Sequence, residues 1–430
     1  SNTGVVHIIA ISGMHLGLIY VVLLWLFGKV PFIRKQKLLK YGSVLVCLWI
    51  FSLITGASAS VLRSAVMFSC IILGELLQKR SNIYNSLAVS AFLLLSYNPL
   101  FIFDVGFQLS YLAILGIVIF QKPIEHLIEP KSFLLRKLNE MVSITIAAQI
   151  MTFPICLYYF HQFPILFLIT NLIAVPLSTF ILFAEIGLIA FHSIVGVGYG
   201  LKIIVEQSIS FLNEMISRID VLPYSSLKNI YADGFTTCII YLIVIFFILL
   251  YQSKNRIYIR GIFLLTILFT CFQTFAKFRI KHQKKIVVYN LNHHQSVCFI
   301  NGENYFIIGD TLPNLKNTIQ YYHLKSRIDN MKDLNYYYPF VIYLNTKMMI
   351  VDSDVKYREL KDKVKVDLLL FSKNAKVKMS DLIKSVVPKI VLIDGSNKKW
   401  KSEFWKKECD SLGINCVQTA ISGYYEYNVH

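Results

Sequence analysis

The sequence predicts a polytopic α-helical membrane protein, with about ten transmembrane helices plus an amphipathic helix, followed by a small α/β domain. Apolar residues make up 55% of the 430-residue chain, charged residues only 16%, and the mean hydropathy is +0.56. Soluble domains rarely have this composition. Residues 1–280 hold 20 Lys and Arg with 10 Asp and Glu, whereas the 150 residues after them hold 23 and 15. We therefore expect a transmembrane channel domain over residues 1–280 and a soluble domain over residues 281–430.

The first domain divides into apolar stretches that are separated by turn residues or charges. The predicted spans run from Val5 to Phe27, Gly42 to Gly56, Val61 to Leu77, Asn85 to Tyr97, Val105 to Phe120, Met141 to Phe160, Phe163 to Val175, Leu177 to Val197, Phe235 to Gln252 and Gly261 to Ala276. Several fall short of the ~20 residues that a helix needs to cross a bilayer. Around Pro99, Pro164 and Pro176 two interpretations stay open: broken or re-entrant helices, and whole spans with ordinary proline kinks.

The positions of charged and polar residues predict how the helices lie in the membrane. Between Leu201 and Ile219 apolar and polar residues interleave, which favours an amphipathic helix along the outer face, with an eleventh span as the alternative. Lys and Arg collect on the cytoplasmic side of short connections. They follow the first, third and fifth spans and are missing from residues 57–60, 98–104 and 161–162. Carried onward, this alternation predicts an extracytoplasmic C-terminal domain, although it leaves the basic segment 277–285 outside as well.

Four long stretches match the pattern of one family in order and spacing. They are TGVVHIIAISGMHLG, GASASVLRSAVM, NPLFIFDVGFQLSYLAILG and ITIAAQIMTFPICLYYFHQFPILFLITNLIAVPLSTFIL. Together they resemble the ComEC competence family, most strongly over residues 3–200. The resemblance implies a multi-pass channel in the bacterial inner (cytoplasmic) membrane that imports single-stranded DNA during natural transformation. It also implies an outer DNA receptor, an ATP-dependent translocase and single-strand-binding proteins as partners, and it leaves a homo-oligomer open.

A polyanion that crosses hydrocarbon needs a hydrated, polar lining, and the first span offers candidates for it. His7 and His15 are candidate pore residues, and Ser12 lies one helical turn before His15 on a shared face. Gly13 and Gly17 have the GxxxG spacing that favours close helix packing. Because buried histidines usually have structural roles, both a pore-lining and a structural interpretation of His15 stay open.

Arg63 and Asp104 are the candidate entry residues. The predicted topology places both at the outer ends of their spans, where a charge needs a partner or water. They can pair with each other or flank an entry mouth, and the alternative is that Arg63 snorkels to lipid headgroups. Gln108 lies one turn beyond Asp104 on the same face, and Asn171 adds a polar group in a later span. Each of these two amides can also serve as a hydrogen-bonding group between helices.

The C-terminal domain is predicted to be α/β. It begins with strand patterns and the hairpin signal Asn301-Gly302, and its last third alternates strand and helix patterns in VDLLLF, MSDLIKSVV, KIVLID, KKWKSEFWKKECDSL and INCVQT. This order resembles the C-terminal half of a metallo-beta-lactamase-like fold, in a truncated form. The 23 Lys and Arg against 15 Asp and Glu leave a net charge of +8, which is compatible with nucleic acid and equally with an ordinary solvated surface.

The metal ligands of that hydrolase fold are not found in this sequence. Its chemistry depends on an HxHxDH loop and further His and Asp ligands that hold two metal ions. No pair of histidines in the C-terminal domain has that spacing; they are His282, His293, His294, His323 and His430. The residues after VDLLLF read SKNA at 372–375, where metal-binding relatives carry His-His-Gly-Ser. We expect no metal, no cofactor and no enzymatic activity, with a metal role for His293 and His294 as the weaker alternative.

Three functions from different classes are compatible with these patterns. The first is a passive channel for single-stranded DNA, since the matched motifs support it and no GxxxxGK[ST] loop of a nucleotide-driven motor occurs. The second is a membrane-anchored metal-dependent nuclease, which the missing ligands disfavour. The third is a small-solute transporter built on broken helices. We take the first, with a catalytically inactive C-terminal domain that docks or guides DNA.

Overall fold

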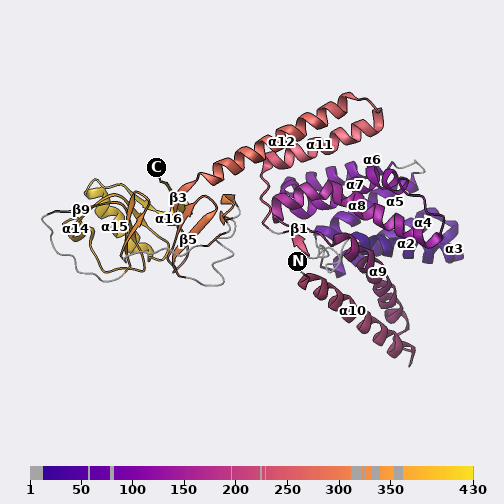
Figure 1. The fold of residues 1–430 in the computed structure, drawn as a ribbon. Coiled ribbons are helices and arrows are strands. Elements are labelled where there is room, and N and C mark those ends of the chain that lie inside the picture. Colours follow the sequence, from indigo (N-terminus) through magenta and orange to yellow (C-terminus); the bar gives the residue numbers. More distant parts are fainter. Residues whose placement is uncertain are drawn as a thin grey trace. The chain divides into compact units, whose positions relative to one another are not determined.

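The computed structural model describes residues 13–56, 59–77, 82–194, 196–222, 225–227, 229–310, 322–323, 325–328, 330–331, 339–352 and 362–429. The candidates His7 and Ser12 lie outside these described residues. The chain forms two compact units, Ser1–Thr266 and Ile267–His430, which we call the membrane unit and the tail unit (Figure 1). Each unit is described by itself.

Three helices at the start of the membrane unit share an apolar core. They are α2 (Gly13–Lys29), α4 (Lys37–Ile54) and α5 (Ala59–Leu76), and the short α3 (Pro31–Lys35) links the first two. Leu16, Leu48 and Ala65, one from each helix, are fully buried in this core. Helices α2 and α5 approach closely at Gly13, which has no side chain. A Cβ built on this glycine would lie only 2.3 Å from Ser64 Oγ.

The next elements are joined by a break at Pro99. Helix α6 (Ile83–Tyr97) is followed by the 3-10 turn η1 (Pro99–Phe103), α7 (Val105–Glu125) and α8 (Phe133–Phe160). The break is a capped turn between two helices, since Asn98 Oδ1 accepts the Leu100 N–H at 3.0 Å and Asp104 Oδ1 accepts the Phe107 N–H at 2.6 Å. Helices α7 and α8 lie side by side, and a Cβ on Gly116 would be 2.4 Å from the Ala147 carbonyl oxygen.

One helix, α9 (Phe167–Phe191), continues through Pro176. The prediction of two separate spans over residues 163–175 and 177–197 is therefore wrong. The proline ring removes a single N–H donor, which leaves the rest of the helical ladder intact. The hydroxyls of Ser178 and Thr179 both donate to the Val175 carbonyl at 2.9 Å, so the polar side chains that follow the proline bond within the helix itself.

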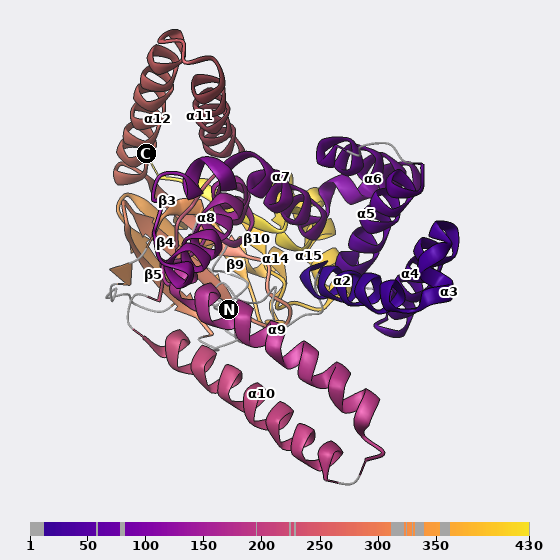
Figure 2. The ribbon, with the colours of Figure 1, turned by 90° about the vertical axis from the view of Figure 1, so that its right-hand side faces the viewer.

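The amphipathic stretch forms α10 (Val197–Val221), which runs antiparallel beside α9 (Figure 2). Leu212 of α10 packs with Ala174 and Ile181 of α9. The segments before and after this hairpin also pair, since β1 (Phe163–Pro164) is antiparallel to β2 (Ser226–Leu227). The chain therefore enters and leaves the α9–α10 hairpin at the same end. Among the described helices, α10 is long but is not one of those apolar enough to cross a membrane, so the amphipathic helix along the outer face and the eleventh span both stay predictions.

The last helices of the apolar region are α11 (Gly234–Ser253) and α12 (Ile257–Lys281). Tyr241 of α11 donates its hydroxyl hydrogen to the Met151 carbonyl of α8 at 2.9 Å. Within the described residues, six helices are long and apolar enough to cross a membrane, namely α4, α7, α8, α9, α11 and α12. Helices α2 and α6 are apolar but shorter. The predicted helical, membrane-type N-terminal region is confirmed at this level.

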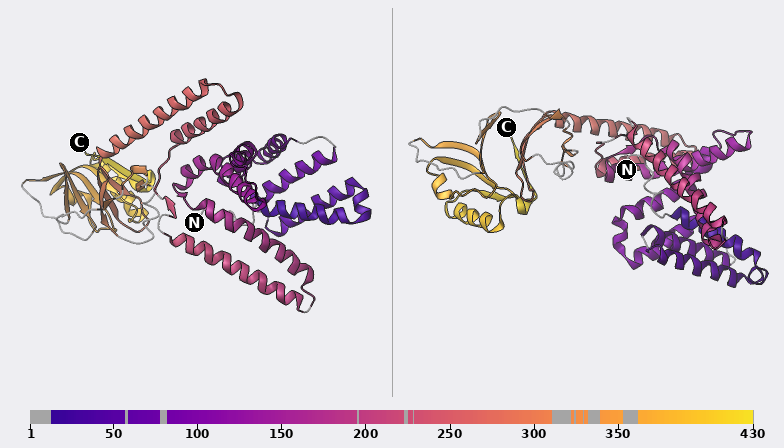
Figure 3. Two further views of the ribbon diagram at one scale, coloured as in Figure 1. Left: turned by 45° about the vertical axis from the view of Figure 1, so that its right-hand side comes forward. Right: turned by 90° about the horizontal axis from the view of Figure 1, so that it is seen from below.

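Two sheets build the tail unit. In the first, the described strands are ordered β12 (Tyr424–Asn428), β3 (Lys284–Tyr289), β4 (Ser296–Asn301), β5 (Asn304–Gly309) and β6 (Asn330–Met331). In the second, the order is β11 (Cys416–Gln418), β10 (Val386–Ile393), β9 (Val364–Phe371), β8 (Thr346–Val351) and β7 (Phe340–Tyr343). Phe299 of the first sheet and Met348 and Leu368 of the second belong to one buried cluster. The sheets therefore pack face to face (Figure 3), and the predicted α/β class is confirmed.

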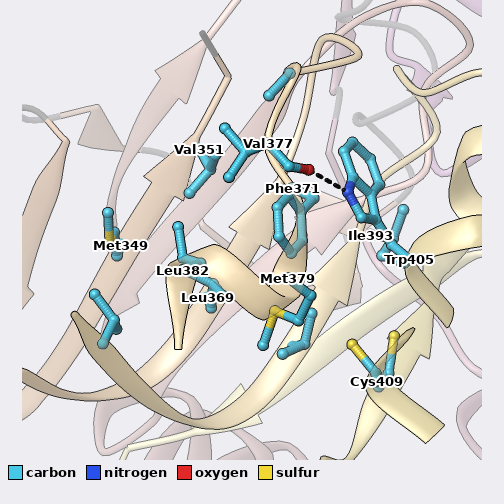
Figure 4. Packing of buried hydrophobic residues seen from close by; sticks show 14 of the residues in the cluster. Met349, Val351, Leu369, Phe371, Val377, Met379, Leu382, Ile393, Trp405 and Cys409 are labelled. Carbon is cyan, nitrogen blue, oxygen red and sulfur yellow. Dashed lines mark hydrogen bonds between the residues drawn. The ribbon is translucent and has the colours of Figure 1, made fainter. Parts of the chain in front are cut away.

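Helices cover the outer face of the second sheet. They are α14 (Met379–Leu382) and α15 (Lys399–Ser411), and a third short helix, α16 (Thr419–Ser422), precedes β12. The fully buried Trp405 of α15 stacks on Phe371 of β9, with the ring centroids 4.4 Å apart. Its indole N–H donates to the Val377 carbonyl at 2.8 Å (Figure 4). This tryptophan ties α15 to both the sheet and the loop after β9.

Candidate functional site

Arg63 and Asp104 form an ion pair in the membrane unit. Arg63 lies in the first turns of α5, and Asp104 is the N-cap of α7. Arg63 Nη1 donates to Asp104 Oδ1 at 3.2 Å, with side-chain exposures of 10% for the arginine and 45% for the aspartate. The structure thus brings together two residues that are 41 positions apart in the sequence.

Glycine at position 106 allows this approach. A Cβ there would lie 3.1 Å from Arg63 Nη2 and 3.2 Å from Asp104 Oδ1, so a larger residue would press on both charged groups. Within the described residues, the buried Nε of Arg63 has no hydrogen-bond partner. The guanidinium therefore has donors that its single carboxylate partner does not use.

A polar stripe follows Asp104 along α7. Gln108 donates from Nε2 to the Ile102 carbonyl at 2.7 Å, while its buried Oε1 has no partner among the described residues. Tyr111, one turn further, donates its hydroxyl hydrogen to Ser90 Oγ of α6 at 3.1 Å. Tyr111 and Ser90 are missing from the sequence-based candidates, although the spacing of 104, 108 and 111 is that of one helix face.

The remaining candidates lie on neighbouring or separate helices. His15 is half-buried on α2. Gly17 lies one turn from Gly13, and its Cβ would be 3.2 Å from the Phe68 ring of α5, so both glycines face the helix that carries Arg63. Asn171 lies in α9, and its buried Oδ1 has no partner among the described residues.

A second polar cluster lies in the tail unit, where β9 and β10 end. The buried Asp394 accepts a hydrogen bond from Ser372 Oγ at 2.6 Å and others from the Ser396 hydroxyl and the Asn397 side-chain amide. Burial raises the pKa of the Asp394 carboxyl to about 6, and these donors oppose the rise without cancelling it. This carboxyl is a structural group that the two loops enclose.

Asp310, just after β5, belongs to the same edge. Lys373 Nζ donates to its Oδ1 at 2.9 Å, and His294 Nδ1 lies 3.4 Å from its Oδ2. Burial alone would raise the pKa of the Asp310 carboxyl, but the hydrogen bonds from Lys373 and the Gln295 N–H outweigh burial and lower it. Across the described residues, no three His, Cys, Asp or Glu side chains are grouped so that they could hold a metal ion.

Comparison with known proteins decides the family of the chain. The family described as Competence protein matches residues 1–254, and the family described as ComEC C-terminal domain matches residues 286–429. The chain belongs to the ComEC family of competence proteins. ComE operon protein 3 of Bacillus subtilis (strain 168) is 31% identical to it over 179 residues, which are 41% of this chain and 22% of that protein. The match therefore spans less than a quarter of that relative, and no solved structure matches.

Family membership and the six long apolar helices together make this ComEC-family chain a multi-pass membrane protein. The Arg63–Asp104 pair lies inside the region matched by the competence family. The Asp394 and Asp310 cluster lies inside the matched ComEC C-terminal domain. Each candidate site thus belongs to a different family region and a different compact unit.

Proposed function

We propose that this chain is a passive transmembrane channel for the import of single-stranded DNA during natural transformation. The observation that carries the proposal is the Arg63–Asp104 pair in the competence region, whose arginine keeps an Nε–H without a partner among the described residues. A charge in an apolar helix bundle is costly, and such residues usually mark an ion or substrate path. Guanidinium is the side-chain group best suited to phosphate, because its donors form a planar fork.

The Arg63 guanidinium is only partly paired by Asp104, which suits a DNA path because a strand must be released there as well as bound. Conduction requires contacts strong enough to admit the substrate and weak enough to release it. Asp104 is more exposed than Arg63, so it can exchange its hold on the guanidinium for water while a phosphate passes. The partly unsatisfied amides of Gln108 and Asn171 are the further polar groups that we assign to the path.

The sidedness of the chain follows from the crossings and the basic connections. Because β1 pairs with β2, residues 163 and 227 lie on the same side of the membrane, whatever α9 and α10 do between them. The positive-inside rule then keeps Lys254, Arg256 and Arg260 in the cytoplasm. We therefore propose that the Arg63–Asp104 pair lies at the outer ends of α5 and α7, and that the two sheets of the tail unit lie outside the cytoplasmic membrane.

We further propose that the tail unit is not a nuclease. Asp310 is engaged by Lys373, and Asp394 is enclosed by hydroxyl and amide donors. A metal ligand needs free carboxylate oxygens, whereas here an ammonium and hydrogen-bond donors occupy them. A passive channel needs a partner that pulls the strand through it. We propose an ATP-dependent translocase for this role, along with an outer DNA receptor and single-strand-binding proteins.

The test is DNA uptake by cells that lack this protein and are complemented with the chain or a variant. The intact chain should restore entry of fluorescent DNA. Arg63→Glu, which puts a like charge opposite Asp104 and the phosphates, should abolish entry while the protein stays in the membrane. Arg218→Glu is the matched control, since Arg218 is an exposed arginine on α10 and its reversal should leave uptake intact.

Two outcomes would overturn these proposals. Uptake that is unchanged by Arg63→Glu would remove the pair from the DNA path. Cleavage of single-stranded DNA by the purified full chain with added zinc or manganese would revive the nuclease alternative, because a metal would then have displaced Lys373 or the hydroxyl donors.

A further inference from the structure

The carboxyl ends of β9 and β10 continue into two lysine-rich loops. Residues 372–378 and 395–402 contain no Asp or Glu, and they carry Lys373, Lys376, Lys378, Lys398, Lys399 and Lys401. The two strands are parallel neighbours, so their carboxyl ends meet at one sheet edge. Ligands of α/β folds bind at such edges.

Asn374 joins the two loops. Its Oδ1 accepts the Lys398 N–H at 2.7 Å, and its own N–H donates to Asn397 Oδ1 at 2.9 Å. Lys401 Nζ donates to the Asn374 carbonyl at 2.6 Å. Because the loops are held by these bonds, their lysines belong to one surface and do not move independently.

The lysines on the first loop face solvent. Lys376 and Lys378 are exposed, and they alternate with Ala375, Val377 and Met379, which are buried against the second sheet. The alternation anchors the segment through its apolar side chains. It leaves the ammonium groups as the accessible part of the loop.

An exposed aromatic side chain stands beside these lysines, with Lys401 Nζ over its ring at 6.0 Å from the centroid. Trp400, in the first turn of α15, is 65% exposed, whereas Trp405 five positions later is fully buried in the core. Phe404, one turn after Trp400, is also exposed. Trp400 and the partly exposed Phe404 thus offer aromatic surface to solvent beside the lysines of the two loops.

We propose that this lysine-tryptophan surface, formed by residues 376–378 and 398–404, binds single-stranded DNA. Unpaired bases stack on Trp400 and Phe404, and Lys378, Lys398 and Lys399 contact the phosphates. Aromatic platforms beside a basic groove are the general means of holding a single strand. The inference rests on the proposed channel function and extends it: the tail unit holds the strand on the same side of the membrane as Arg63.

The surface fits a single strand better than a duplex or a lipid bilayer. A duplex keeps its base faces stacked inside, so it offers nothing to an indole ring except at its ends. A helix that lies in a membrane interface needs a broad apolar face, whereas the other solvent-facing residues around these rings include Lys399, Glu403 and Lys407. An anionic bilayer is therefore the competing ligand in the test.

The experiment uses the full chain in nanodiscs of phosphatidylcholine and a fluorescein-labelled oligothymidylate, followed by anisotropy. Trp400→Ala should weaken binding about tenfold, and Trp400→Phe, which keeps an aromatic face, should restore most of it. Lys398→Ala with Lys399→Ala should weaken binding and lower the slope of log affinity against log salt by about 1.4. Thermal unfolding of each variant reports whether the tail unit is still folded.

The matched control is Lys363→Ala with Lys365→Ala. These exposed lysines lie at the amino end of β9, so the variant loses the same charge at the opposite sheet edge, and its affinity should stay within twofold. Equal affinities for the control and the Lys398/Lys399 variant would overturn the inference. So would variants that bind DNA normally but lose binding to phosphatidylserine vesicles, since that result would assign the surface to lipid.

Uptake assays separate this inference from the channel proposal. If Arg63→Glu blocks DNA entry while Trp400→Ala leaves both strand binding and entry unchanged, the surface is wrong and the channel stands. If the surface variants lose strand binding while Arg63→Glu leaves entry unchanged, the surface stands and the entry pair is wrong.

Discussion

Two buried charged groups, Asp394 in the tail unit and Arg63 in the membrane unit, differ in how fully their hydrogen-bonding atoms are paired. In the tail unit, the carboxyl of Asp394 is enclosed by hydrogen-bond donors from Ser372, Ser396 and Asn397. In the membrane unit, Arg63 bonds to one carboxylate oxygen and keeps a buried Nε–H without a partner among the described residues. A satisfied network is what a stable core requires. An unsatisfied donor in an apolar bundle is instead a sign of a ligand or of water.

The two units also differ in what brings their elements together. The tail unit fills its interior with large side chains, of which Trp405 and Phe371 stack at 4.4 Å. The membrane unit also packs apolar side chains, and in addition it brings helices into close contact at Gly13 and Gly116, as is usual where lipid already solvates apolar side chains. Substitutions should therefore have different consequences in the two units.

The largest effect on DNA uptake is expected at Arg63. Arg63→Ala should lower transformation by about 100-fold, a factor that corresponds to about 3 kcal/mol, because it removes the fork that binds phosphate. The transformation frequency of Arg63→Lys should lie between those of Arg63→Ala and the wild type, since lysine keeps the charge but not the planar donors. Transformation frequency and membrane abundance are the measurements, and equal frequencies for Ala and Lys would show that the donor geometry is irrelevant.

In the tail unit, the largest loss of stability is expected from Trp405→Ala. Removing a fully buried indole should lower the free energy of unfolding by about 4 kcal/mol, and it also leaves the Val377 carbonyl without its donor. Thermal unfolding of the full chain is the measurement. Trp400→Ala is the control, because Trp400 is largely exposed and should change stability by less than about 0.5 kcal/mol. Similar losses for both tryptophans would contradict the assignment of one to the core and the other to a binding surface.

An effect on stability that is smaller than that of Trp405→Ala, and that depends on pH, is expected at Asp394. Its pKa of about 6 lies above the ordinary 3.8, so the folded tail unit holds this proton more tightly than the unfolded chain does. This proton therefore contributes about 3 kcal/mol to the free energy of unfolding. The contribution is complete below about pH 4 and is lost as the pH rises through about 6. The difference in unfolding temperature between Asp394→Asn and the wild type should therefore grow in favour of the variant from pH 4 to pH 7. A constant difference would mean that the carboxyl is not protonated in this range.

The sequence predicts the class of each unit, because composition and strand periodicity depend on local residues. It also singles out Arg63 and Asp104, since the alternation of basic connections places both at one depth; the structure shows that they touch. The continuity of α9 through Pro176 is not visible in the sequence, because a proline ends a helix in water but is tolerated where the neighbouring helices and hydroxyls satisfy the backbone.

The polar cluster of Asp310 and Asp394 in the tail unit is predicted less well than the fold that carries it. The sequence shows which metal ligands are missing, but it cannot show that Lys373 reaches Asp310, 63 residues away. Contacts of that range depend on how two sheets face each other. The exposed position of Trp400 is likewise invisible, since the pattern KKWKSEFWKKE carries two tryptophans and only packing separates the buried one from the exposed one.

The smallest effect, about 2 kcal/mol, is expected from Gly116→Ala, which tests whether the membrane unit depends on backbone contact. The added Cβ would meet the Ala147 carbonyl oxygen at 2.4 Å, whereas no described atom lies within 4 Å of a Cβ on Gly42. Gly42→Ala, in the helix α4, should be neutral or stabilising by contrast, because alanine favours helix. Unfolding in mixed micelles gives the change in stability for both variants.

The same substitution should also affect function, because α7 carries Asp104 at its start. Separating α7 from α8 should disturb the Arg63–Asp104 pair, so Gly116→Ala should lower transformation and Gly42→Ala should not. Loss of stability without loss of transformation would mean that the pair tolerates movement of its helix and that the entry site is less rigid than its hydrogen bonds indicate.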